Sequence, residues 1–507
     1  MPFLLALTPI LIILVLMVGF RWSAARAGSA GYLSALMIAI YAFGAGAQLL
    51  AYAHMKALLL TIDVLLIIWT AFLLYRVSDE AGAIRTISLA LPLLTPDRGF
   101  QALIIGWVFA SFLQSVGGFG VPVAVVAPIL IGIGFSPISA VIIPSIGHSW
   151  SVTFGSMGSS FNALIAATRM PAETLAPPSA LFLGISALLV GILVAHACGG
   201  WLTIRRLLLP VFIIGTTMAV IQYLVATQGP WNLSAFIATS TGLLIAIPLA
   251  YRQRGKTTEK NYFRIKPILI ALSGYIVLIG LTLFIQLIPE IRSFLGKVEL
   301  ALSFPEVSTS LGYITPEGIG RKIPIFNHAG MVLFYTSIIA YIIYKFAGLY
   351  HAGAEKHILK GTVQRAMPSS VSIASMVAMA VIMEFSGMTN TLAHGLSESI
   401  GSFYPFAAPW IGTLGAFMTG SNTNSNVVFG ALQMQTARIL GFSMAIILAA
   451  QTAGGSLGSV IAPTKIIVGA STAGLANREG EIMGKLILYT AILILLISLL
   501  TIIFLAI

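Results

Sequence analysis

Long apolar runs alternate with short polar breaks along almost the whole chain. Segments such as 4–20, 180–197 and 486–507 carry almost no charge. Each has about the length that an α-helix needs to cross about 30 Å of hydrocarbon. The pattern predicts an all-α polytopic membrane protein with about twelve transmembrane helices. The predicted crossings are 3–20, 30–50, 57–75, 138–168, 179–200, 207–226, 234–251, 267–288, 329–348, 368–388, 443–474 and 486–507.

Two further apolar stretches, 100–135 and 404–440, are interrupted near their middles by small and polar residues. The interruptions fall at Gly117–Pro122 and at Gly420–Asn426. Because both arms of each stretch stay apolar, each is predicted to be a re-entrant hairpin whose tip lies inside the membrane.

The regions around these hairpins form an internal repeat. Gly134-Phe135-Ser136 recurs as Gly441-Phe442-Ser443, and the Gly-Ser-Met-Gly-Ser sequence at 155–159 returns as Gly-Ser-Leu-Gly-Ser at 455–459. A continuous helix over 138–168 would extend about 46 Å, much more than one hydrocarbon thickness. The sequence therefore predicts a break in that helix at 155–160 and a corresponding break after 455.

Composition excludes an ordinary soluble protein. Of the 507 residues, 58% are hydrophobic and 8% are charged, whereas a soluble domain carries about a quarter charged residues. Cys198 is the only cysteine, which excludes disulfide frameworks and cysteine metal sites within one chain. The net charge of +12 is assigned to cytoplasmic loops and not to nucleic-acid binding.

The basic residues predict the orientation of the chain. With the N-terminus outside, 19 of the 27 Lys and Arg fall in inside loops, and both termini lie outside. Loop 289–328 is then a long outer cap. The first hairpin unit starts from the basic loop 76–98, but the second starts from loop 389–402, which has no Lys or Arg, so the two repeats are inverted. The inside loops are 21–29, 76–98, 201–206, 252–266, 345–366 and 475–485.

Inverted repeats with interrupted helices are typical of secondary transporters, whose substrate site lies near the membrane midplane where the repeats meet. Unpaired amide N–H groups at the start of a half-helix carry partial positive charge and can hold a carboxylate. In lipid these groups would be costly unless they lined a polar cavity, so the breaks indicate a hydrated interior.

Several ordered motifs then resemble those of the L-lactate permease family. The resemblance covers about 75–200 and 365–490, and it implies proton-coupled carriage of L-lactate, D-lactate or glycolate. It also implies a relation to a wider ion-transporter superfamily, in which hairpins and broken helices form an elevator-like transport domain that moves against a scaffold. The motifs are Pro96-Asp97-Arg98, Gly117–Ala124, Phe385–Thr389, Gly420–Asn426 and Glu479-Gly480-Glu481.

This interpretation divides the chain into scaffold and transport segments. Residues 1–98 are N-terminal scaffold helices, and residues 99–178 are the first hairpin and broken helix. Residues 179–402 are further scaffold helices with the outer loop, residues 403–485 are the second hairpin and broken helix, and residues 486–507 are a C-terminal helix.

Two positions depart from the family pattern. Gln114 stands where the family usually has a glutamate before the first hairpin tip, and Asn422 stands where the second tip usually has an aspartate. Both exchanges keep hydrogen-bonding capacity but remove a carboxylate that could carry a proton. A coupled proton would therefore need another titratable group.

The hairpin tips and breaks supply the candidate substrate-binding residues. The glycine tip offers bare backbone beside an apolar wall at Phe119, which suits a small carboxylate with a methyl group, although a simple tight turn is the alternative. Asn and Ser at the second tip could equally cap a helix start, and Lys465 could instead extend to the inner surface. The candidates are Gln114, Gly117, Gly118, Phe119, Gly120, Ser156, Ser159, Ser421, Asn422, Thr423, Asn424, Ser425, Asn426, Ser456 and Lys465.

Ionisable residues inside crossings are rare and costly, so each is a functional candidate. For proton coupling the candidates are His148, Asp63 and Glu384. His148 comes first, because it precedes the first break by seven residues and histidine titrates near neutral pH. A structural histidine and an interface glutamate are the alternatives.

The function predicted is secondary active transport of a small monocarboxylate, by proton symport, across the plasma membrane. No cofactor or metal is expected, and the coupling ion is expected to be H⁺. The sequence is also compatible with a homo-oligomer. A sodium-coupled carboxylate or dicarboxylate carrier, or an anion channel, is the alternative. A membrane enzyme is not expected, because His-Glu-x-x-His and Gly-x-Ser-Gly are absent from the sequence.

Overall fold

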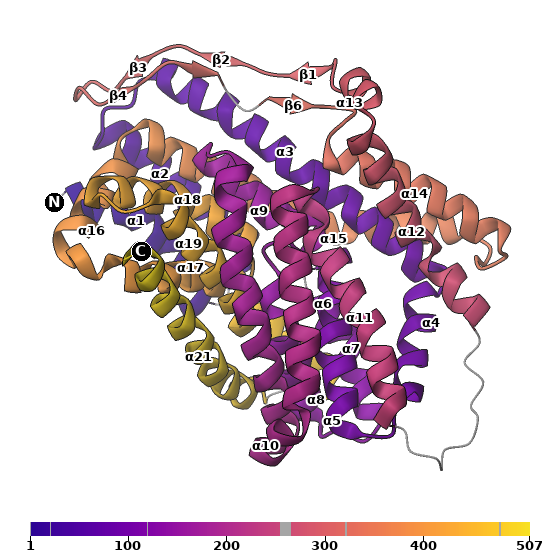
Figure 1. Cartoon of the computed structure of the whole chain (residues 1–507). Coiled ribbons are helices and arrows are strands. Elements are labelled where there is room, and N and C mark those ends of the chain that lie inside the picture. The colour runs from indigo at the N-terminus through magenta and orange to yellow at the C-terminus, as the bar shows by residue number, and fades with distance from the viewer. Residues whose placement is uncertain are drawn as a thin grey trace.

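The computed structural model describes residues 2–506 except 21, 119, 254–264, 320–321 and 476–477. These residues form a bundle of helices with a narrow strand ladder lying along one end (Figure 1). Within this described part, nine helices are long and apolar enough to cross a membrane. The polytopic helical class predicted from the sequence agrees with this architecture.

The N-terminal region contains three helices, α1 (Pro2–Leu14), α2 (Ala24–Tyr41) and α3 (Ala47–Glu80). The predicted crossing 30–50 is wrong, because α2 ends at Tyr41 and a turn precedes α3. In that turn Gly44 has φ of 70°, a left-handed conformation that glycine adopts without strain. At 34 residues, α3 is much longer than the predicted crossing 57–75, and it runs obliquely across the bundle (Figure 1).

Two segments predicted as loops contain helices. Loop 76–98 includes α4 (Ala83–Ala90), and loop 389–402 is mostly α16 (Met388–Ile400). Both are amphipathic, with Ile84 and Ile87 buried in α4 and Leu392 buried in α16. Their polar residues interrupt the apolar runs that mark membrane crossings, so neither helix stands out in the sequence.

The first hairpin unit contains interrupted helices where breaks were predicted. Its first arm runs from Arg98 to Val116 through α5 (Arg98–Gln101), a π-helical stretch (Ala102–Phe109) and α6 (Ala110–Val116), and its second arm is α7 (Val121–Gly132). The following helix is broken into α8 (Pro137–His148) and α9 (Gly155–Thr168).

The second unit has the same order of elements. Its hairpin consists of α17 (Tyr404–Thr419) and α18 (Asn422–Leu440), and its broken helix consists of α19 (Met444–Gly458) and α20 (Pro463–Thr472). The second break begins later than predicted, because α19 continues helically through Gly458. Glycines there serve close packing, since a Cβ on Gly454 would lie 2.0 Å from the Pro409 carbonyl oxygen.

The remaining long helices are α10 (Ala172–Gln228), α11 (Ser234–Gln253), α12 (Ile265–Leu287), α14 (Ala329–Phe346), α15 (Ala354–Phe385) and α21 (Glu479–Ala506). Non-helical backbone at Gly199 and Gly200 divides α10 into two arms. These arms correspond to the predicted crossings 179–200 and 207–226.

The predicted outer cap contains short β-strands. After α13 (Pro289–Leu295), the described part of this loop contains six short strands, which pair antiparallel into a ladder that runs above α3 (Figure 1). The ladder is fastened below, because Thr315 Oγ1 donates to the Phe385 carbonyl at 3.1 Å. The all-α class is therefore corrected by these strands: β1 (Glu299–Leu300) with β6 (Ile323–Pro324), β2 (Ser303–Phe304) with β5 (Gly318–Ile319), and β3 (Val307–Ser308) with β4 (Ile314–Thr315).

Buried apolar side chains fall into two clusters. The larger one joins the first hairpin unit with α10, α11, α19 and α21. The smaller one joins α1, α2, α3, α15 and α16 with one face of α9 and α18. The C-terminal half of the first broken helix and the second arm of the second hairpin therefore pack on α3 and α15.

Candidate functional site

The first helix break lies against the last turns of α19, which lead into the second break. Ser456 Oγ donates to the Ser149 carbonyl at 2.7 Å, and Thr153 Oγ1 donates to the Thr452 carbonyl at 3.0 Å. The Thr153 amide donates in turn to Ser456 Oγ at 3.3 Å. Residues about 300 positions apart are thus joined through polar groups, which places the predicted breaks of both units in one site.

The first break holds its backbone in an unusual conformation. Ser156 and Met157 have φ of 47° and 53°, and Gly158 has φ of 73°. Side-chain-bearing residues rarely adopt this left-handed region, and such strain is concentrated at functional sites. It turns the chain sharply between α8 and the main body of α9.

Each hairpin tip touches a broken helix. A Cβ on Gly118 would lie 1.9 Å from Ser156 Oγ, and a Cβ on Gly420 would lie 2.6 Å from Thr464 Oγ1 at the start of α20. Gly118 and Gly420 both have positive φ, 56° and 71°. Glycine is therefore required at both tips, for the turn and for the close approach. Phe119, predicted as an apolar wall, lies outside the described residues.

A small polar cavity of about 20 Å³ lies where the tips and breaks meet. Seven of its ten lining residues were predicted from the sequence, and Val152, Ser160 and Gly420 are additional. This volume suits about one water molecule. The predicted lining residues are Gln114, Ser156, Ser159, Ser421, Asn422, Thr423 and Lys465.

A second cavity of about 350 Å³ adjoins the first, and Gly420 and Lys465 line both. Arg365 of α15 lines its other side, where it lies 5.2 Å above the Tyr75 ring. Among the described residues, neither lining contains an aspartate or a glutamate. Two cations without a lining acid make this region receptive to an anion.

Lys465 occupies the junction of the two cavities. Its Nζ donates to Ser459 Oγ at 2.9 Å, and Ser459 Oγ donates to the Ser456 carbonyl. The ammonium group is thereby fixed beside the second break. In this conformation Lys465 faces the site instead of extending away to the surface.

The asparagines of the second tip act mainly as links between elements. Asn422 Nδ2 donates to Thr153 Oγ1 at 3.0 Å, Asn424 Nδ2 to Ser372 Oγ of α15 at 3.0 Å, and Asn426 Nδ2 to the Ser160 carbonyl at 2.9 Å. In the described part of the chain, the carbonyl oxygens of these three amides are buried without a hydrogen-bond partner, as is Gln114 Oε1. Such acceptors are available to water, a donor or a cation.

The other predicted site residues do not line the small cavity. Gly117 packs on the Tyr75 ring, and Gly120 lines the larger cavity. Ser425 Oγ donates to the Gly412 carbonyl at 2.7 Å, and Ser456 of α19 donates to the Ser149 carbonyl at the first break.

His148 lies at the end of α8 and is completely buried. Its Nδ1 lies 2.6 Å from the Pro144 carbonyl, which can only accept, so Nδ1 carries the proton. Nε2 is buried without a partner among the described residues.

The other two proton candidates lie away from the cavity, at the contact between α3 and the first unit. Asp63, 1% exposed, accepts bonds from Asn162 of α9 at 3.0 Å and from His328 at 2.9 Å. His328 and Asn162 were not among the residues predicted from the sequence. The signal for His328 is its place directly before an apolar run, where a helix cap is expected.

Glu384 is ion-paired with a buried lysine of α3. Lys56 belongs to α3, is 3% exposed, and lies 2.7 Å from Glu384. Arg169, at the end of α9, lies 3.8 Å from the other carboxylate oxygen. A buried ammonium needs such a partner, because an unpaired charge there would be strongly destabilising.

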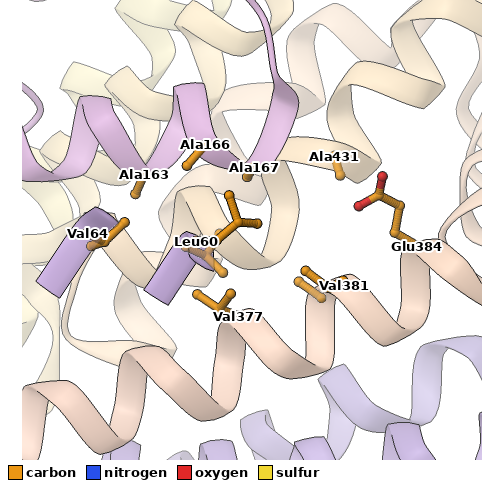
Figure 2. A pocket seen from close by; sticks show the side chains of 11 residues that line it. Leu60, Val64, Ala163, Ala166, Ala167, Val377, Val381, Glu384 and Ala431 are labelled. Carbon is orange, nitrogen blue, oxygen red and sulfur yellow. The ribbon is translucent and has the colours of Figure 1, made fainter. Parts of the chain in front are cut away.

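Between these two polar clusters, α9 and α18 meet α3 and α15 across a smooth apolar surface. Figure 2 shows Ala163, Ala166 and Ala167 on one side and Leu60 and Val64 on the other. A pocket of about 20 Å³ remains between them. The side of this pocket that α9 contributes is lined by alanines, which leave few interlocking contacts.

The chain is similar in sequence to permeases. A family model described as L-lactate permease matches residues 2–507. The L-lactate permease of Bacillus subtilis is 28% identical, over 86% of this chain and 83% of the relative. The glycolate permease GlcA of Escherichia coli is 25% identical, over 94% of this chain and 91% of the relative.

A solved structure of the Alcanivorax borkumensis YdaH transporter covers 87% of this chain and 84% of its own, with 17% identity and a TM-score of 0.47. This likeness is too slight to carry an argument about the present chain.

Proposed function

Because the chain belongs to the L-lactate permease family, we propose that it is a secondary active transporter of small monocarboxylates such as lactate and glycolate, driven by proton symport. Its relatives are permeases and not enzymes. The observation that carries the proposal is the site where both hairpin tips meet the broken helices, with Lys465 and Arg365 in its linings and no aspartate or glutamate among the described lining residues.

The substrate carboxylate binds beside Lys465 and the hydroxyl groups of Ser156 and Ser159. At 4 Å and an effective dielectric constant near 20, opposite unit charges attract by about 4 kcal/mol, from which desolvation is subtracted. The short apolar tail extends toward the first tip. Since the small cavity holds about one water, the substrate enters through the adjoining cavity of about 350 Å³, and the tips separate to admit it.

The coupled proton binds to Nε2 of His148. That nitrogen is an acceptor without a described partner, in the same unit as the first tip. A bound carboxylate offsets the positive charge of a protonated ring, so anion and proton favour each other's binding. This reciprocity is what symport requires.

The two units move together as the transport domain, and α3 and α15 belong to the scaffold. The alanine-lined contact of α9 with α3 supports this elevator-like division. Equivalent glycine contacts within the two units support the inverted repeat. A Cβ on Gly147 would lie 1.9 Å from the Gly106 carbonyl oxygen, and a Cβ on Gly454 would lie 2.0 Å from the Pro409 carbonyl oxygen.

Uptake of labelled lactate into proteoliposomes tests this function. The pH gradient and the sodium gradient are imposed separately, and exchange against internal lactate is measured at equal pH. Saturable uptake that an inward proton gradient stimulates, with competition by glycolate, is expected. If succinate or citrate outcompetes lactate at equal concentration, the monocarboxylate assignment is wrong.

A sodium-coupled carboxylate carrier is the second candidate. It is favoured by the buried carbonyl oxygens of Asn422 and Asn426, which are ligands of the kind that a hard cation takes. Uptake that follows the sodium gradient at equal pH would establish it. Flux without exchange stimulation would instead identify a channel.

A further inference from the structure

The larger of the two adjoining cavities, of about 350 Å³, has one wall on the proposed scaffold. There α15 lines it with Arg365 and Ser369. The opposite wall belongs to the two hairpin units and includes Gly420 of the second tip with Thr464 and Lys465 of α20. A carboxylate in this cavity can therefore contact the scaffold as well as the units, whereas the binding proposed above uses groups of the units alone.

Arg365 presents an unpaired guanidinium group to this cavity. The group lies 5.2 Å above the Tyr75 ring, and in the part of the chain that the structure describes it has no ion-pair or hydrogen-bond partner. The acids at the end of α3 are already paired, since Asp79 and Glu80 bind Arg76 at 2.8 and 3.2 Å. A guanidinium stacked on a ring still offers the N–H groups along its edge, and these form a planar fork that matches a carboxylate.

Arg365 lies toward the end of α15 that is remote from the strand ladder. At the other end, the Phe385 carbonyl accepts from Thr315 of the ladder at 3.1 Å, and the helical rise from Arg365 to Phe385 is about 30 Å. The ladder belongs to the loop predicted outside, so Arg365 is near the face predicted inside. Because Lys465 lies where this cavity meets the small central one, the cavity extends from the central site toward the inner face.

We propose that Arg365 and Ser369 form a carboxylate-binding site on the scaffold, which the substrate occupies between Lys465 and the inner solution. The site rests on the proposed transport of a monocarboxylate and assigns the residues that meet it at the inner face. The guanidinium donates two N–H groups to the carboxylate. The Ser369 hydroxyl, whose hydrogen bond to the Arg365 carbonyl is long at 3.5 Å, supplies a further donor.

The two cations then act at different stages of transport. Lys465 belongs to the moving units and stays beside the substrate throughout, but Arg365 stays with the scaffold. Arg365 therefore strengthens substrate binding only while the central site faces inside. Removal of either charge weakens binding, and the face of the membrane at which it does so distinguishes the two roles.

Labelling of a cysteine next to the guanidinium tests the site without transport. Ser369→Cys in a Cys198→Ser background is modified in inside-out vesicles by an anionic and by a cationic methanethiosulfonate. A fixed positive charge concentrates anions near it, so the ratio of the anionic to the cationic rate should fall about tenfold when Arg365→Gln is added. Arg252→Gln, which removes an exposed arginine at the end of α11, should leave the ratio as it was. An unchanged ratio in Arg365→Gln would overturn the site.

Affinity measured at each face tests the role in transport. The half-saturating lactate concentration for exchange at equal pH is determined in right-side-out and in inside-out vesicles. Arg365→Gln is expected to raise it about tenfold in inside-out vesicles and to leave it unchanged in right-side-out vesicles. Lys465→Gln should raise it at both faces. An Arg365→Gln variant that changes both faces equally, or neither, contradicts a scaffold site at the inner face.

Arg365→Lys decides the matter if Arg365→Gln does not fold. Lysine keeps the charge but not the planar fork, so the labelling ratio should be retained while the inner half-saturating concentration rises about threefold. An unchanged inner value would rule out the carboxylate contact. Absence of lactate exchange at both faces, with a labelling ratio that depends on Arg365, would refute the proposed substrate and leave the anion site standing. Normal lactate exchange with an unchanged ratio would do the reverse.

Discussion

At the residue scale, the site is defined by polar groups placed inside an apolar bundle and by the absence of acids from the linings described. Gln114 and Asn422 keep hydrogen-bonding capacity without charge, and Lys465 brings the positive charge to the junction of two cavities. The electrostatic balance is therefore shifted toward anions. Two substitutions separate binding of the anion from coupling to the proton.

Lys465→Gln is expected to weaken substrate binding by about tenfold or more, equivalent to about 1.4 kcal/mol. The reason is loss of a fixed cation that interacts with the carboxylate at reduced dielectric. Equilibrium binding of labelled lactate to purified protein measures it, with Lys360→Gln, an exposed lysine of α15, as the charge-matched control. Unchanged affinity would mean that the substrate does not meet this ammonium group.

His148→Gln is expected to abolish stimulation of uptake by an inward proton gradient while sparing lactate exchange at equal pH. Glutamine keeps a hydrogen-bonding side chain, but it cannot take up a proton in this pH range. Parallel assays of gradient-driven uptake and of exchange measure the two activities in the same vesicles. Persistent proton stimulation would assign the coupled proton to Asp63, to Glu384 or to the substrate.

At the scale of elements, apolar runs and their interruptions predicted both hairpins and both broken helices. The turn at 42–46 was missed, because its residues are nearly as apolar as the helices beside it. The links of Asn422, Asn424 and Asn426 were also beyond prediction, since they depend on which helices meet. His328 and Asp63 are 265 positions apart, and a local pattern contains no information on such a pair.

Gly118→Ala tests the first hairpin tip as an element. Its φ of 56° strains any side chain, and the added Cβ would lie 1.9 Å from Ser156 Oγ. Left-handed backbone costs an L-residue about 1–2 kcal/mol before the collision is counted. We expect about tenfold lower uptake from a protein that still elutes as a single species, whereas Gly132→Ala, with open space around it, should transport normally.

At the scale of the whole molecule, the charge of the loops predicts which loops face the cytoplasm and which face outside. The strand ladder and the facing ends of α11 and α12 lie at opposite ends of the bundle (Figure 1). The ladder belongs to the loop predicted outside, and the residues between α11 and α12 carry most of the basic loop predicted inside. The charges of the loops alone therefore predict which loops lie on opposite sides of the membrane. The pairing of the short strands could not be predicted, because it depends on how the chain folds.

Single cysteines at positions 256 and 310, in a background without Cys198, test this orientation. The loop at 252–266 carries six Lys and Arg residues, the largest number among the predicted inside loops, and basic loops are retained on the cytoplasmic side. Position 310 is exposed in the ladder. In right-side-out vesicles, an impermeant maleimide should label the cysteine at 310 directly and the one at 256 only after permeabilisation.

The labelling pattern also bears on the inverted repeat, since the first unit starts from a basic loop and the second from a loop without Lys or Arg. Two inverted units require their starting loops, 76–98 and 389–402, to face opposite sides of the membrane. Labelling of 256 and 310 from the same face would place two loops separated by a single crossing, α12, on one side. That outcome would remove the inverted arrangement, and with it the symmetry that brings both hairpin tips to one central site.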